Sequence, residues 1–202
     1  DIWNSASASD EFIFSGWFGR YLSNNHSSYP EGYPNNEYPD PLALTIGRTA
    51  SNTCQGPIVN MGMSIKNLNS FVDIKDGEGD VPDTPYGHEL QYIRTASKLT
   101  NDYFERLEEA AGYGGNSKIE YPELNLAQQL KIVAQLIAGG LKSKIFVVRL
   151  GGFDTHDNQV DSGDTETGRH ANLMEELSES VSAFQEDIID RGLEERVLTM
   201  TY

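Results

Sequence analysis

The sequence has a single cysteine, few basic residues and no long apolar run. The one cysteine, Cys54, excludes an intrachain disulfide. Its 15 Lys and Arg residues against 31 Asp and Glu residues give a formal net charge of −16, which disfavours binding to nucleic-acid phosphates and anionic lipid headgroups. No apolar stretch approaches the ~20 residues of a membrane-spanning helix. Neither a Gly-x-Ser-x-Gly elbow nor a phosphate-binding glycine loop with lysine is present, so two common catalytic motifs are excluded.

The chain of 202 residues is long enough to bury a substantial core, and its composition divides it into two parts. Residues 1–83 are irregular and rich in aromatic residues and proline, and they form either part of the main domain or a cap. Within this part we expect a short helix at 15–23, a loop at 24–41 that contains four prolines, and strands at 42–47 and 57–62.

Residues 84–202 show the pattern of helices and a strand–helix–strand unit. Helices are predicted at 84–112, 124–140 and 168–192, and strands at 144–150 and 196–202. The two strands should be parallel and adjacent, because a helix connects them through a right-handed crossover. Two strands do not make a stable sheet, so we expect the sheet within this chain to be incomplete.

The first of these helices has clear start signals and one apolar face. Thr84 is placed to cap it, and Pro85 occupies the first helical position. Spacings of three and four residues predict an inward stripe of Tyr86, Leu90, Ile93, Ser97, Phe104, Leu107 and Ala111.

Chemistry-bearing side chains follow directly after the predicted strand 144–150. Gly151 and Gly152 allow a sharp turn, and Asp154 and His156 come next, two positions apart, so that their side chains leave an extended backbone on the same side. Carboxylate and imidazole groups are ordinary ligands of zinc, manganese or iron, so a shared metal is one interpretation. The alternative is that Asp154 caps a turn and His156 is a surface residue. His170 and Asp157 are candidate additions to the site.

Three weaker signals lie elsewhere. Asp73, Asp76, Glu78 and Asp80 lie in an acidic turn that could hold calcium, although a solvated turn fits the spacing better. His88 near a helix start favours a surface or capping role over metal ligation. The tripeptide at Asn25 matches a glycosylation sequon.

The motif VVRLGGFDTHDNQ, residues 147–159, resembles the most distinctive motif of the bacterial family known as domain of unknown function 1501. The phrases DIWNSA, GWFGRYL, PLALTIG and SVSAFQEDIIDRGLEERVLTMTY are similar to its other recurring phrases, in the same order. This family is placed among the sulfatase-like proteins of the alkaline-phosphatase superfamily. The resemblance implies a doubly wound, mostly parallel α/β fold and export from the cell. It also implies further segments before residue 1 and after Tyr202, and these would carry most of the remaining metal ligands.

Two functions are consistent with this resemblance. The first is metal-dependent hydrolysis of a small phosphate or sulfate ester, with Asp154 and His156 binding zinc, manganese or calcium. The second is a non-catalytic surface or assembly protein that keeps the fold without the chemistry and binds a protein partner through the loop at 24–41. Neither interpretation involves nucleic acid or a transmembrane segment.

Overall fold

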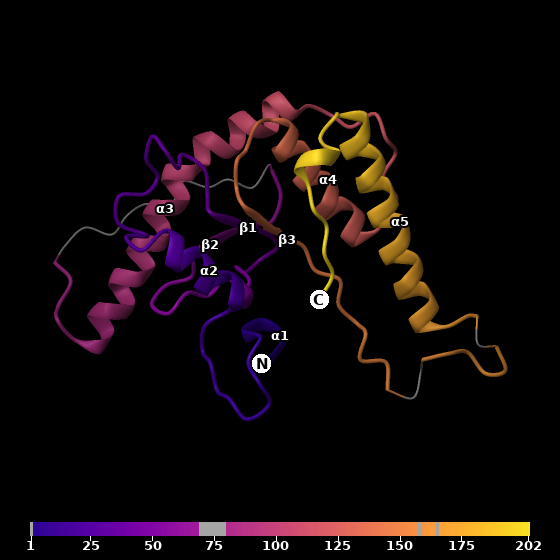
Figure 1. Cartoon of the computed structure of the whole chain (residues 1–202), viewed down its shortest axis with the longest axis horizontal. Helices are drawn as coiled ribbons and strands as arrows, with labels where there is room; N and C mark the ends of the chain where they lie inside the picture. Colours follow the sequence, from indigo (N-terminus) through magenta and orange to yellow (C-terminus); the bar gives the residue numbers. More distant parts are fainter. Residues whose placement is uncertain (1, 69–79, 157–158, 165) are drawn as a thin grey trace.

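The computed structural model describes residues 2–68, 80–156, 159–164 and 166–202, and it has an α/β architecture (Figure 1). Its sheet has three parallel strands in the order β2-β1-β3. The strands are β1 (Ala43–Ile46), β2 (Gly62–Ile65) and β3 (Ile145–Val147). Because β1 comes from the first part of the chain and β3 from the second, the two parts share one sheet.

The main helices confirm the sequence predictions to within a few residues. They are α2 (Trp17–Asn25), α3 (Pro85–Gly114), α4 (Asn125–Ala138) and α5 (Arg169–Asp190). The predicted cap of α3 is confirmed, because the Thr84 hydroxyl accepts a hydrogen bond from the Gly87 N–H at 3.1 Å. Shorter elements are α1 (Ile2–Ser5) and the 3₁₀ turns η1 (Asn52–Cys54) and η2 (Glu194–Arg196). None of the described helices is both long and apolar enough to cross a bilayer.

The central strand β1 is buried along its whole length and has a separate apolar cluster on each side. Leu44 and Ile46 belong to the larger cluster, in which residues of α3, α4 and α5 pack against the sheet. Ala43 belongs to the smaller cluster, together with Leu22 of α2 and Val147 of β3. Burial on both faces explains why β1 has no solvent-facing row of polar residues, since its one polar residue, Thr45, is also buried.

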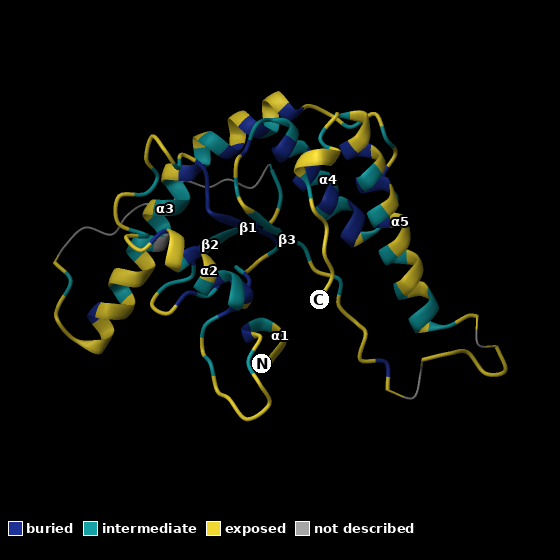
Figure 2. Cartoon of the chain, viewed as in Figure 1, coloured by how far each residue is buried: buried dark blue, intermediate teal, exposed yellow. Residues whose placement is uncertain are grey.

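The predicted inward face of α3 is wrong in its first half. Tyr86 and Ile93 are 70% and 57% exposed, whereas Tyr103, Leu107 and Ala110 in the second half of the helix are fully buried. In Figure 2 the amino-terminal part of α3 is largely exposed and extends away from the sheet. Periodicity identified a helix with an apolar stripe, but the part of the stripe that is covered depends on where α4 and the sheet lie.

Strand β2 begins where the predicted strand 57–62 ends. Residues before it form a turn, in which Gly56 N–H donates to the Val59 carbonyl at 2.8 Å. Gln55 and Asn60 form an isolated antiparallel bridge across this turn. Pro57 has no N–H to donate to a strand ladder, which is consistent with a turn at this position.

The predicted strand 196–202 is wrong. The chain forms η2 there and then continues without ladder pairing, held by side chains: the Tyr202 hydroxyl lies 2.7 Å from Thr53 Oγ1, and Gln185 Nε2 donates to Thr199 Oγ1 at 2.8 Å. The continuation of β3 has another partner. Gln129 of α4 accepts a hydrogen bond from the Arg149 N–H and donates one to the Arg149 carbonyl, both at 2.9 Å. A side-chain amide therefore takes up the backbone groups that a neighbouring strand would have bound.

Candidate functional site

The three strands are parallel, so their carboxyl ends lie at one edge of the sheet, where ligands of open α/β folds bind. After β3 the chain runs away from the sheet and returns to the outer end of α5 (Figure 1). Gly152 has a φ of 101°, in the left-handed region, and a Cβ there would lie 3.5 Å from the Arg169 guanidinium and 3.6 Å from Leu173. The glycine therefore makes the turn that brings this loop close to the start of α5. Gly151 is exposed and has no close neighbours.

Asp154 and His156 lie side by side in this loop. His156 Nε2 is 3.3 Å from Asp154 Oδ2, and the two side chains are 79% and 82% exposed, respectively. Thr155 between them is buried, so its side chain leaves in a different direction. His156 has a φ of 47°, the left-handed region that residues other than glycine seldom adopt. The two groups are thus close together and accessible to a ligand from solvent.

The distance between the two side chains suits a shared tetrahedral metal. Two ligands that each lie about 2.1 Å from a tetrahedral ion are separated by about 3.4 Å. The measured 3.3 Å between Oδ2 and Nε2 is close to that value. This distance is compatible with two of the four positions around zinc, and it is also that of a direct contact between a carboxylate and an imidazole.

The described residues do not supply the remaining positions. Within residues 2–68, 80–156, 159–164 and 166–202, no group of three or more His, Cys, Asp or Glu side chains is placed to hold a metal. The ring of His170 packs edge-on against Phe153, with ring centres 6.5 Å apart. Asp157 and the acidic residues Asp73, Asp76 and Glu78 lie outside the described residues. The structure therefore brings together Asp154 and His156 and no third ligand from the described chain.

The segment that follows the pair is acidic. Asp161 and Asp164 form an isolated bridge, and Asp164 Oδ1 accepts a hydrogen bond from the Glu166 N–H at 2.8 Å. All three residues are exposed. These carboxylates favour a cation over an uncompensated anion in the loop between β3 and α5.

A buried hydroxyl cluster near the carboxyl end of β1 was missed by sequence reasoning. Thr53 is fully buried, and its Oγ1 lies 2.9 Å from Asn4 Oδ1 and 2.7 Å from the Tyr202 hydroxyl. Ser51 Oγ donates to the same oxygen at 3.2 Å. Asn4 and Tyr202 lie 49 and 149 positions away from Thr53 in the chain, so no local spacing predicts that they join the cluster. The partners of Thr53 in this cluster are uncharged side chains. Through Asn4 and Tyr202, Thr53 links the two ends of the described chain to η1.

Compared with known proteins, the chain matches no family model, no curated protein and no solved structure.

Proposed function

We propose that this chain belongs to an exported, alkaline-phosphatase-like hydrolase that cleaves phosphate or sulfate esters with the help of a divalent metal. The observation that carries the proposal is the approach of Asp154 and His156 to 3.3 Å, beyond the carboxyl end of a strand in a parallel sheet. Their spacing fits two ligands of one ion, and their exposure leaves them open to it. The motif in which they occur supports the same chemistry by resemblance.

In this proposal Asp154, His156 and Gly152 have different roles. Asp154 contributes negative charge that offsets the positive charge of an ion, and neutral His156 contributes a nitrogen lone pair. Gly152 makes the turn that directs the loop towards α5. A bound divalent ion would polarise an ester oxygen and offset the negative field of the neighbouring carboxylates.

The first test is zinc binding measured by isothermal titration calorimetry on the full chain. We expect Asp154→Ala and His156→Ala each to weaken zinc binding at least about tenfold, because each removes one ligand. A matched control is available at the start of α3, where Nε2 of His88 in the helix lies 3.0 Å from Oδ1 of Asp83 just before it, and both side chains are largely exposed. The variant Asp83→Ala should leave zinc affinity unchanged. An equal loss in Asp83→Ala and Asp154→Ala would show that any exposed acid–imidazole pair binds zinc, and would contradict the proposal.

The second test is hydrolysis of p-nitrophenyl phosphate and p-nitrophenyl sulfate with added zinc or manganese. Turnover that is lost in Asp154→Ala and retained in Asp83→Ala would support the proposed enzyme. A folded protein that binds zinc at Asp154 but cleaves neither ester would reject the hydrolase and leave only a metal-binding role.

A non-catalytic binding role is the second candidate, and one observation favours it. Phe12 and Phe14 are 81% and 86% exposed, and their rings contact each other edge to face with centres 4.7 Å apart. Exposed aromatic residues are common in binding surfaces. The loop at 24–41, the expected interaction surface, instead directs Tyr29, Tyr33 and Tyr38 partly into the smaller apolar cluster. If Asp154→Ala retains every measured property of the parent protein, this candidate replaces the hydrolase.

A further inference from the structure

A basic residue follows the carboxyl end of each strand of the sheet. Arg48 lies two residues after β1, Lys66 directly after β2, and Arg149 two residues after β3. The strands are parallel and lie side by side in the order β2-β1-β3 (Figure 1), so all three residues lie at the carboxyl edge of the sheet. Neighbouring strands are about 4.8 Å apart, so the three side chains start within roughly 10 Å of one another. Long, flexible Arg and Lys side chains can reach one ligand from these positions.

Hydrogen bonds hold the backbone next to these side chains. The Gly47 N–H donates to the Ile65 carbonyl at 2.8 Å, so the pairing of β1 with β2 continues up to the residue before Arg48. The backbone N–H and carbonyl of Arg149 are both bonded to the Gln129 side chain at 2.9 Å. The backbone from which the cations extend is therefore held in place before a ligand binds, which favours binding.

The side chain of Arg149 lies on the side of β3 that faces β1. Burial raises the pKa of the Cys54 thiol, and the positive charge of Arg149 acts in the opposite direction, so the guanidinium is near η1. This 3₁₀ turn follows β1 and Arg48 in the chain. Arg149 is therefore within electrostatic reach of the segment that follows Arg48.

The three cations have no carboxylate partner among the described residues. All three are exposed, and none of their side chains makes an ion pair or hydrogen bond within the described part of the chain. By contrast, Arg106 pairs with Asp40 and Arg191 pairs with Asp187. In a chain with 31 acidic and 15 basic residues, three such cations at one edge reverse the overall charge locally.

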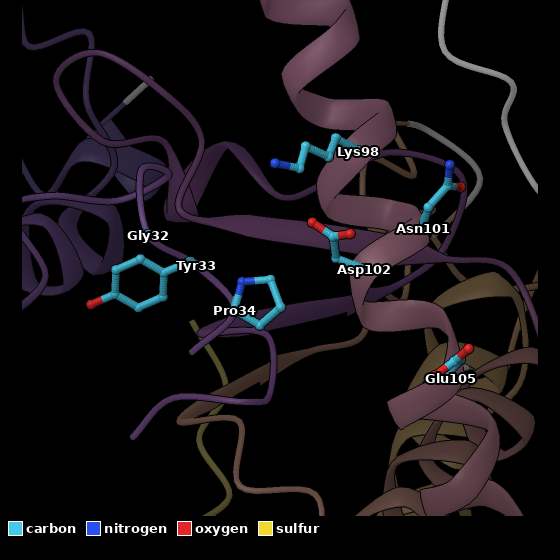
Figure 3. A pocket seen from close by; sticks show the side chains of 7 residues that line it. All are labelled: Gly32, Tyr33, Pro34, Lys98, Asn101, Asp102 and Glu105. Atoms are coloured by element: carbon cyan, nitrogen blue, oxygen red, sulfur yellow. The ribbon is translucent and has the colours of Figure 1, made fainter. Parts of the chain in front are cut away.

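An exposed lysine elsewhere has different surroundings. Lys98 lines a hollow between residues 32–34 and α3, and Asp102 and Glu105 line the same hollow (Figure 3). The carboxylates there outnumber the ammonium, so that hollow does not favour an anion. Of these two surfaces, the carboxyl edge of the sheet is the one whose charge favours an anion.

We propose that Arg48, Lys66 and Arg149 form a binding site for a tetrahedral oxyanion, the phosphate or sulfate group of an ester. Each guanidinium can bond two oxygens of such a group, and the Lys66 ammonium adds a third positive charge. A phosphate or sulfate monoester has three terminal oxygens and a carboxylate has two, so the monoester offers one oxygen to each cation. A free metal ion would be repelled by all three residues. That the anion belongs to an ester rests on the proposed function, whereas the anion site itself does not depend on a metal.

Isothermal titration calorimetry with sodium phosphate and sodium sulfate tests this proposal on the full chain, with EDTA present to remove metals. We expect at least one of the two anions to bind, and the one with the lower Kd identifies the class of ester. Arg48→Gln and Arg149→Gln should each raise that Kd at least about tenfold, as loss of a hydrogen bond between charged groups predicts. Both residues are exposed, so neither change should affect folding, which circular dichroism checks.

The matched control is Lys144→Gln. Lys144 is exposed and directly precedes β3, so this change removes the same charge from the opposite edge of the same strand and should leave the Kd unchanged. The proposal is overturned if neither anion binds, if acetate binds as tightly as they do, or if Lys144→Gln weakens binding as much as Arg149→Gln. Anion binding without ester turnover would support this site and reject the hydrolase, so the two proposals can fail separately.

Discussion

Asp187 is a buried charged residue whose removal should strongly destabilise the fold. It lies on α5 and is fully buried. Its Oδ2 accepts a hydrogen bond from the Tyr121 hydroxyl at 3.0 Å, and its Oδ1 accepts one from Arg191 Nε at 2.7 Å. Arg191 also donates to the Gly114 carbonyl at 2.7 Å. One carboxylate therefore joins the end of α3, the segment before α4 and the end of α5.

The expected cost follows from what Asp187→Ala leaves behind. The Arg191 side chain is only 13% exposed and would lose its counter-charge, and the buried Tyr121 hydroxyl would lose its acceptor. Breaking a buried ion pair by removing one partner costs about 3–5 kcal/mol. Tyr121→Phe removes only one hydrogen bond to a charged group, so it should cost about 1.5–3 kcal/mol. In the Tyr121→Phe background, Asp187→Ala should cost less than it does alone, because no hydroxyl is left unsatisfied.

Urea denaturation followed by circular dichroism measures these free energies of unfolding. A control lies one turn along the same helix, where Asp190 pairs with Lys118 at 3.2 Å and the Lys118 side chain is 81% exposed. Asp190→Ala should cost less than about 1 kcal/mol, as is usual for surface pairs. If Asp187→Ala costs no more than Asp190→Ala, burial does not set the strength of this network and the reasoning is refuted.

Three further predictions concern buried groups. Burial raises the pKa of the Cys54 thiol from 9.0 to about 12. The contribution of the protonated thiol to the free energy of unfolding should therefore be complete below pH 9 and lost as pH rises from about 9 to 12. Thiol labelling at pH 8 should therefore follow global unfolding, and fast labelling of the folded chain would contradict this. Burial, and secondarily the charge of Lys144, lowers the pKa of His26. The contribution of the neutral imidazole to the free energy of unfolding should therefore be present above pH 6.5 and lost as pH falls below that value. In thermal melts, His26→Phe should reduce the loss of stability between pH 7 and 5, and an unchanged slope would argue against it. Gly19→Ala should lower the melting temperature, because a Cβ there would overlap the Gln55 carbonyl oxygen, and an unchanged Tm would mean that η1 shifts without cost.

Local signals predicted the helices well because those signals act within a few residues. Thr84 and Pro85 mark the start of α3, and the structure places its first residue at Pro85. The two-residue spacing predicted that Asp154 and His156 lie close together, but the structure brings them together through a turn with a φ of 47° at His156 and not through extended backbone. Both features depend on neighbours in sequence, so one sequence is enough to predict them.

Features that depend on distant residues could not be predicted in this way. The hydrogen bond from Tyr121 to Asp187 spans 66 positions, and neither residue type identifies its partner. The exposure of Tyr86 and Ile93 depends on the extent of α4 and the sheet beneath α3. An apolar stripe predicts that a helix can pack against other elements, and the length of those elements decides how much of the stripe is buried.

Residues 196–202 have the composition of a strand but make no ladder pairing, and just beyond β3 the backbone groups of Arg149 are bonded to Gln129. Gln129 lies on α4, and the amino terminus of α4 is held in turn by α5, because Glu176 Oε1 accepts a hydrogen bond from the Leu126 N–H at 3.1 Å. Asp154 lies five residues after Arg149. The helices α4 and α5 therefore together hold the point from which the loop with Asp154 leaves the sheet. Substitutions at the interface of these two helices should therefore affect Asp154 and His156 without contacting them.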